Sequence, residues 1–142
     1  MKNVAIIGGS GFIGSHTAEE LMRHDVNVTI IDLDPPKVSN VTWFECDATD
    51  YSQLFKALDS AQFDAVYMFA AVSDSSLNHE HIRYSVETNI MTLMNALSIM
   101  NDLCIPRIIF SSSVWVYSLC EDTDVCEESK LILNQCDHMY TL

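Results

Sequence analysis

Residues 4–16 read VAIIGGSGFIGSH, and no other part of the chain is as informative. The apolar run at residues 4–7 has no polar alternation, which is typical of a strand buried on both faces. All the glycines of the 142-residue chain follow at positions 8, 9, 11 and 14. Glycine confined to one short segment indicates a backbone requirement at that place. The segment therefore predicts a strand, a tight turn and the start of a helix.

The glycines fit two overlapping spacings, GxGxxG over residues 9–14 and GxxGxxG over residues 8–14. Between a strand and a helix, such glycines permit the turn, the approach of a pyrophosphate and close helix–sheet packing. The free N–H groups and partial positive charge of the helix N-terminus also favour a phosphate. The alternative is a glycine-rich turn that binds nothing. The residues expected to hold a dinucleotide are Gly8, Gly11, Phe12, Ile13 and Gly14.

An aspartate ends the next apolar run, at residues 28–31. Asp32 lies 18 residues after Gly14, where a carboxylate can accept hydrogen bonds from the hydroxyls of an adenosine ribose. The same charge would repel a 2′-phosphate, and no arginine is near it in the sequence, so NAD is favoured over NADP as the cofactor. Asp34 is the competing candidate.

Apolar runs and stretches with helical spacing alternate along the rest of the chain. Right-handed crossovers then give a parallel sheet with helices on both faces and the strand order 3-2-1-4-5. We expect an α/β fold of the Rossmann type, doubly wound, as one domain over residues 1–142. The strands are expected at residues 4–7, 28–31, 41–46, 65–71 and 107–110, and the helices at 11–24, from 50 onward and at about 80–101.

Two of these helices carry further signals. Asp50 and Gln53 have the spacing of a capping box at the start of the second helix. In the long helix, Asn89 falls within an apolar stripe, where a buried amide needs hydrogen-bond partners. The residues expected to form this stripe are Ile82, Val86, Ile90, Leu93, Leu97 and Met100.

The composition excludes several classes of protein. Hydrophobic residues make up 49% and charged residues 19%, which is the opposite of a disordered chain. A formal charge of −13 argues against nucleic acid and anionic membranes as partners. The longest apolar run, residues 65–72, is far shorter than the ~20 residues of a membrane helix, and the N-terminus does not resemble a signal peptide. We expect a cytoplasmic protein.

The cysteines and histidines do not form a metal or disulfide motif. The five cysteines include no CxxC pair, so we expect reduced thiols, although Cys120 and Cys126 lie close in sequence. His79 and His81 have the spacing of metal ligands, but no third ligand stands out. We expect no metal.

With these features, the chain resembles the extended short-chain dehydrogenase/reductase family, in particular its NAD-dependent nucleotide-sugar epimerases and dehydratases. The likeness covers essentially the whole chain and is greatest to members that resemble UDP-glucose 4-epimerase. The segments that carry it are GGSGFIGSH at 8–16, IDLD at 31–34, CDATD at 46–50, YMFAAVSD at 67–74, ETNIMTLMNAL at 87–97 and FSSSVWVYS at 110–118.

The resemblance implies roles for further residues around the cofactor. Asp47 and Ala48 would meet the adenine edge. Asn89 would steady the backbone of the active site, with satisfaction by local backbone as the alternative. The others implied to lie against the cofactor are Phe69, Ala70, Ala71 and Ser111.

The resemblance also implies catalytic residues. Ser113, chosen over its two serine neighbours because it begins SVWVY, would bind the sugar hydroxyl that is oxidised. Tyr140 lies 27 residues later and would be the general base of a YxxxK motif. The lysine of that motif would fall two positions beyond residue 142, and without it a tyrosine keeps a pKa near ~10.

These observations leave two functional hypotheses. The first is the NAD-binding domain of a nucleotide-sugar epimerase or dehydratase, an isomerase or lyase, truncated and inactive as a 142-residue chain. Its implied partners are a nucleotide-sugar substrate and a second copy in a homodimer. The alternative is a non-catalytic dinucleotide-binding module, such as a redox-sensing regulator.

Overall fold

The computed structural model describes residues 2–72, 82–117 and 124–129. In this part of the chain, five parallel strands form a sheet in the order β3-β2-β1-β4-β5. The predicted α/β fold and strand order are confirmed. The strands are β1 (Asn3–Ile7), β2 (Asn27–Asp32), β3 (Thr42–Glu45), β4 (Ala65–Met68) and β5 (Ile108–Phe110).

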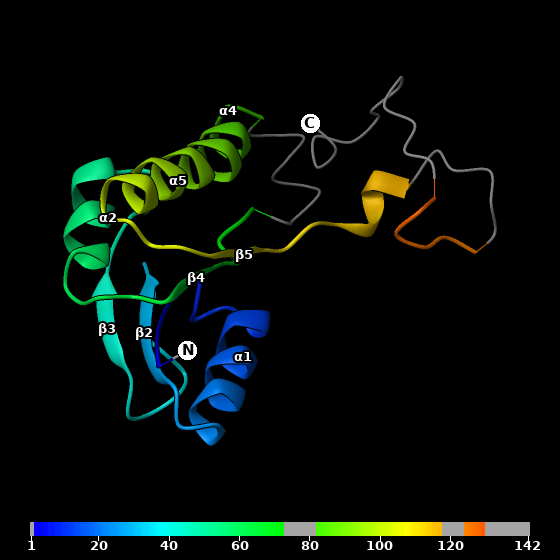
Figure 1. The fold of residues 1–142 in the computed structure, drawn as a ribbon. Coiled ribbons are helices and arrows are strands. Elements are labelled where there is room, and N and C mark those ends of the chain that lie inside the picture. Colours follow the sequence, from blue (N-terminus) through cyan, green and yellow to red (C-terminus); the bar gives the residue numbers. More distant parts are fainter. Residues whose placement is uncertain (1, 73–81, 118–123, 130–142) are drawn as a thin grey trace.

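Helices cover both faces of the sheet (Figure 1), with α1 on one face and α2 and α5 on the other. Within the described residues, no helix is long and apolar enough to cross a membrane. The helical segments are α1 (Phe12–Arg23), α2 (Tyr51–Leu58), α4 (Ile82–Val86), the π-helical segment η1 (Glu87–Met91), α5 (Thr92–Asp102) and the 3-10 turn η2 (Val114–Tyr117).

The central strand β1 contributes side chains to both faces. Val4 and Ile6 pack with Ala18 of α1, whereas Ala5 and Ile7 pack in the cluster that includes residues of α2 and α5. All four strand residues are buried. An apolar run without polar alternation is therefore explained by two covered faces.

The start of α2 is fixed by the predicted capping residues. Asp50 accepts hydrogen bonds from the backbone N–H groups of Ser52 and Gln53, at 2.8 and 3.1 Å. The Gln53 amide also donates to Asp50, while its oxygen accepts from the backbone N–H of Asp47 at 3.1 Å. The cap therefore also holds the turn that carries Asp47.

The long helix has only part of the predicted apolar face. Its α-helical parts α4 and α5 are joined by the π-helical segment η1. Ile90 and Leu97, both expected in the core, are each 44% exposed, while Thr92 and Ile99 are 1% and 0% exposed. Because a π-helical turn contains more residues than an α-helical turn, it rotates every later side chain relative to the α-helical phase. The predicted stripe is wrong at Ile90 and Leu97 for this reason, whereas Met100 is buried and Leu93 packs against the core, as predicted.

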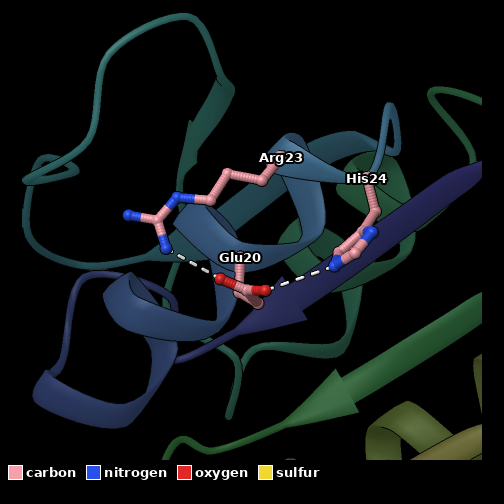
Figure 2. A network of polar contacts seen from close by, with 3 residues as sticks. All are labelled: Glu20, Arg23 and His24. Carbon is pink, nitrogen blue, oxygen red and sulfur yellow. Dashed lines mark hydrogen bonds and ion pairs between the residues drawn. The ribbon is translucent and has the colours of Figure 1, made fainter.

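A small network of polar contacts lies at the C-terminal end of α1 (Figure 2). Glu20 accepts hydrogen bonds from Arg23 at 2.8 Å and pairs with His24 at 3.2 Å. The hydrogen bond from Arg23, followed by that from His24, lowers the pKa of the Glu20 carboxyl. All three side chains are exposed, so the network contributes little to the stability of the protein.

Candidate functional site

Gly8 and Gly14 are required by the turn between β1 and α1. A Cβ on Gly8, whose φ is +83°, would lie 2.4 Å from the backbone nitrogen of Ala70. A Cβ on Gly14 would lie 2.3 Å from the carbonyl oxygen of Gly8. No side chain fits at either position, so both glycines are explained by the packing of the backbone.

Gly11 differs from these two residues. It is the N-cap of α1 with φ −69° and ψ 177°, which any residue can adopt. A Cβ there would have one near neighbour, the Gly8 carbonyl oxygen, at an ordinary contact distance of 3.4 Å. The fold does not require glycine at this position. The missing side chain instead leaves the N-terminus of α1 open to the close approach of an anion.

Asp32 is held beside the glycine turn. Its Oδ2 accepts a hydrogen bond from the backbone N–H of Ser10 at 2.9 Å, and its Oδ1 accepts from that of Asp34 at 3.1 Å. Each carboxylate oxygen can accept a further hydrogen bond. Asp32 lines the pocket described next, whereas Asp34 does not. Of the two predicted candidates, the structure brings Asp32 to the site.

A pocket of about 310 Å³ lies at the carboxyl ends of the strands. This volume is within the usual range of small-molecule sites, roughly 300–1,000 Å³. In open α/β sheets, ligands bind at this edge. The residues predicted from the sequence that line the pocket are Gly8, Asp32, Asp47, Ala48 and Ala70.

The turn that carries Asp47 is fixed from two sides. Asp47 Oδ1 accepts hydrogen bonds from the backbone N–H and the hydroxyl of Thr49, at 2.9 and 2.7 Å. The side-chain amide of Asn95 donates to the carbonyl oxygens of Ala48 and Thr49, at 3.2 and 2.9 Å. Asn95 was not predicted. The sequence feature that marks Asn89, an amide side chain on a helix that packs against the sheet, is also present at Asn95.

Asn89 binds the backbone that follows β4. Its Oδ1 accepts from the N–H of Val72 at 2.7 Å, and its Nδ2 donates to the carbonyl oxygen of Val72 at 3.3 Å. The partner is therefore the segment after β4, 17 residues earlier in the chain, and not the helix itself. Asn89 does not line the pocket, and its place in a cofactor site stays a prediction.

Other predicted cofactor residues lie around the pocket without lining it. Phe12 and Ile13 are exposed on the first turn of α1. Phe69 packs on the α1 face of the sheet, with its ring centroid 5.9 Å from that of Tyr67. Ala71 is exposed. Their contacts with a cofactor stay predictions.

The serines follow β5 at the same edge of the sheet. The N–H and the hydroxyl of Ser111 both donate to the carbonyl oxygen of Met68, at 3.4 and 3.3 Å. Ser113 is partly buried, and its carbonyl accepts from Val116 at 3.2 Å. Tyr140, the predicted base, lies outside the described residues, as do His79, His81, Cys120 and Cys136.

Sequence reasoning missed the wall of the pocket formed by the long helix. Tyr84, Glu87, Thr88 and Thr92 line it from α4, η1 and α5. Glu87, Thr88 and Thr92 lie in the segment ETNIMTLMNAL, but no role was predicted for them, and the burial of Thr92 depends on the π-helical turn that precedes it. Within the described residues, no group of potential metal ligands is present.

Cys46 also lines the pocket. Burial, followed by the charges of Asp47 and Asp50, raises the pKa of its thiol to about 11. The thiol is therefore neutral at pH 7 and serves as a packing group. Cys104 and Cys126 are exposed free thiols.

A second cavity, of about 920 Å³, lies at the opposite edge of the sheet and is lined by Asn3, Asp64 and Ile105, among others. It is larger, but it is far from the glycine turn and at the amino ends of the strands. The smaller pocket is the better candidate, since ligands of open α/β sheets bind at the carboxyl ends.

The model of the NAD dependent epimerase/dehydratase family matches residues 4–137. The chain belongs to this family. The predicted cofactor, NAD, is thereby confirmed as the cofactor of the family.

Curated members of the epimerase/dehydratase family are similar to most of this chain. UDP-glucose 4-epimerase from Lactobacillus helveticus is 29% identical over 140 residues, which cover 90% of this chain and 40% of the relative. UDP-glucose 4-epimerase 3 from Oryza sativa subsp. japonica is 28% identical over 145 residues, 91% of this chain and 39% of the relative. The chain thus spans about 40% of the length of these epimerases.

Solved epimerase structures have the same fold. UDP-glucose 4-epimerase from Brucella ovis in complex with NAD has a TM-score of 0.88 and 25% identity, covering 99% of this chain and 44% of that one. The enzyme from Stenotrophomonas maltophila, with bound NAD and formylated UDP-arabinopyranose, has the same TM-score and identity, covering 99% and 45%.

Proposed function

We propose that this chain is the NAD-binding part of a nucleotide-sugar epimerase or dehydratase. The observation that carries the proposal is Gly11. It is a glycine that the fold does not need, at the open N-terminus of α1 and in the turn that Asp32 binds through Ser10. A pyrophosphate at this position accounts for the absence of a side chain.

The described residues fit a dinucleotide. The backbone N–H groups at the start of α1 would hold the pyrophosphate, and Asp32 would accept hydrogen bonds from the ribose hydroxyls. The pocket lined by Asp47, Ala48 and Ala70 would hold the adenine. NAD, when bound, supplies a hydride acceptor, and the protein supplies its orientation.

The substrate and the chemistry are further parts of the proposal. Relatives that share the fold are UDP-glucose 4-epimerases, which supports a nucleotide sugar as the substrate. Ser113 would bind the reacting hydroxyl and Tyr140 would exchange its proton. A cytoplasmic location stays a prediction from the sequence.

Titration calorimetry with NAD⁺ and NADP⁺ tests the cofactor site. The wild-type chain should bind NAD⁺ more tightly, and Asp32→Ala should lower the NAD⁺/NADP⁺ affinity ratio about tenfold or more. The variant loses charge-assisted hydrogen bonds to the ribose and no longer repels a 2′-phosphate. Asp34→Ala is the matched control and should leave the ratio unchanged. No heat with either dinucleotide would refute the proposed function.

The homodimer is also a proposal, and an exposed apolar stripe supports it. Ile90, Met94 and Leu97 lie on the exposed side of η1 and α5, at spacings of four and three residues. Such a stripe on a helix is suited to pairing with a second copy about a two-fold axis. Sedimentation equilibrium should detect a dimer that Met94→Glu weakens at least about tenfold, since a buried unpaired charge is costly. A wild-type monomer at all concentrations would contradict it.

A further inference from the structure

The pocket is lined by acids and, among the described residues, by no basic side chain. Its carboxylates belong to Asp32, Asp47 and Glu87. An ionised carboxylate can only accept hydrogen bonds. A ligand group that contacts these carboxylates must therefore present hydrogen-bond donors.

The carboxylate oxygens of the pocket differ in how many hydrogen bonds they accept from the protein. Each oxygen of Asp32 accepts a backbone N–H, and Asp47 Oδ1 accepts twice from Thr49. Glu87 Oε1 accepts from Nε of Arg83 at 2.7 Å. Within the described part of the chain, Asp47 Oδ2 and Glu87 Oε2 have no protein partner. Two acceptors are thus left for a ligand.

The π-helical turn shapes the wall on which Glu87 lies. Tyr84, Thr88 and Thr92 line the pocket at intervals of four residues. In an uninterrupted α-helix, the eight residues from Tyr84 to Thr92 would exceed two full turns by about 80°. Met91, seven residues after Tyr84, would then face the pocket in place of Thr92. The extra residue of η1 removes this offset, so Met91 is 45% exposed and Thr92 is 1% exposed. Such π-helical turns are frequent at functional sites.

The wall also contains a polar atom whose burial costs folding free energy. The hydroxyl of Thr92 is buried and has no hydrogen-bond partner among the described residues. Buried hydroxyls without a partner are rare in folded proteins. A buried polar side chain on the pocket wall, at the position that the π-helical turn gives to Thr92 and not to Met91, is a second indication that the wall serves a ligand.

We propose that Glu87 is a specificity-determining residue that accepts a hydrogen bond from the exocyclic amino group of the bound purine. This inference rests on the proposed function. The amino group of adenine carries two N–H donors, which match the two unpartnered oxygens of Asp47 and Glu87. A purine with a carbonyl oxygen at the same position offers an acceptor instead, and these carboxylates would repel it. The π-helical wall therefore selects an aminopurine.

The test compares NAD⁺ with nicotinamide hypoxanthine dinucleotide, which has a carbonyl group in place of the amino group. Binding of each to the full chain is measured by titration calorimetry. The wild-type chain should prefer NAD⁺. Glu87→Met should weaken NAD⁺ binding about tenfold, as expected for one hydrogen bond to a charged acceptor, and should leave the binding of the hypoxanthine analogue unchanged. Glu87→Gln, which adds a donor, should move the preference towards the analogue.

Arg83→Met is the matched control. It removes the same ion pair as Glu87→Met but keeps the carboxylate, so it should preserve the preference for NAD⁺. Equal losses for both dinucleotides in Glu87→Met and Arg83→Met would assign Glu87 a structural role and overturn the inference. A wild-type chain that binds both dinucleotides equally would also overturn it, with the proposed function intact. A wild-type chain that binds neither would refute the proposed function and the inference together.

Discussion

Gly14→Ala is expected to lower the free energy of unfolding by at least about 3 kcal/mol, at the upper end of the cost of overpacking. The added Cβ would lie 2.3 Å from the carbonyl oxygen of Gly8 and 2.7 Å from Cα of Gly9. Both are backbone atoms, which cannot turn away as a side chain can. Because small domains are stable by only about 5–15 kcal/mol, much of that stability would be lost. Urea unfolding followed by circular dichroism measures the change.

Gly11→Ala is the control for this experiment. The same methyl group at position 11 meets the Gly8 carbonyl oxygen at 3.4 Å, an ordinary contact. We expect its free energy of unfolding to stay within about 1 kcal/mol of the wild-type value, as for most exposed substitutions. Equal unfolding midpoints for the Gly14 variant and the wild type would show that the turn can rearrange, against the packing described above.

Gly11→Val is expected to weaken NAD⁺ binding by about 100-fold or more while the protein stays folded. The valine side chain would stand at the N-terminus of α1, where the pyrophosphate would bind. The loss of two charge-assisted hydrogen bonds, at about 1.5–3 kcal/mol each, accounts for an effect of this size. Titration calorimetry gives the affinity, and circular dichroism shows that the helices persist.

Phe12→Ala serves as the neighbouring control. Phe12 is exposed on the first turn of α1 and does not line the pocket. Its N–H group is unchanged by the substitution, so NAD⁺ affinity should fall by less than about fivefold, within the range of contacts near the rim of a site. Tight NAD⁺ binding by the Gly11→Val variant would mean that the pyrophosphate does not lie at this turn.

The fold could be predicted from the sequence because its signals are local. The apolar run of β1, the clustered glycines and the Asp50 cap each act over a few residues, and the structure contains all of them. The β4 strand was predicted to continue to residue 71 but ends at Met68. There the N–H groups of Phe69 and Ala70 both donate to the carbonyl of Ile7, at 2.8 and 3.0 Å. The chain thus turns towards Gly8, which a pattern of hydrophobicity does not reveal.

The site could be predicted only where it is built from strand ends. Asp32 is the last residue of β2, and Asp47 and Ala70 lie two residues after β3 and β4, so their position at the carboxyl edge of the sheet follows from the topology. Thr92 reaches the pocket because the π-helical turn before it changes the phase of the helix, and Glu87 lies at the start of that turn. A prediction that assumes 3.6 residues per turn along the whole helix does not include that change.

The central position of β1 has a consequence for the order of folding. Val4 pairs with Val28 on one side and with Ala65 on the other. During synthesis, the first strand can therefore complete one of its two hydrogen-bonded edges early. Its second edge stays open until more than about 60 further residues have emerged, and closing that loop costs chain entropy. A nascent chain of the first 50 residues presents an unpaired apolar edge to chaperones and to other nascent chains, a state prone to misassembly.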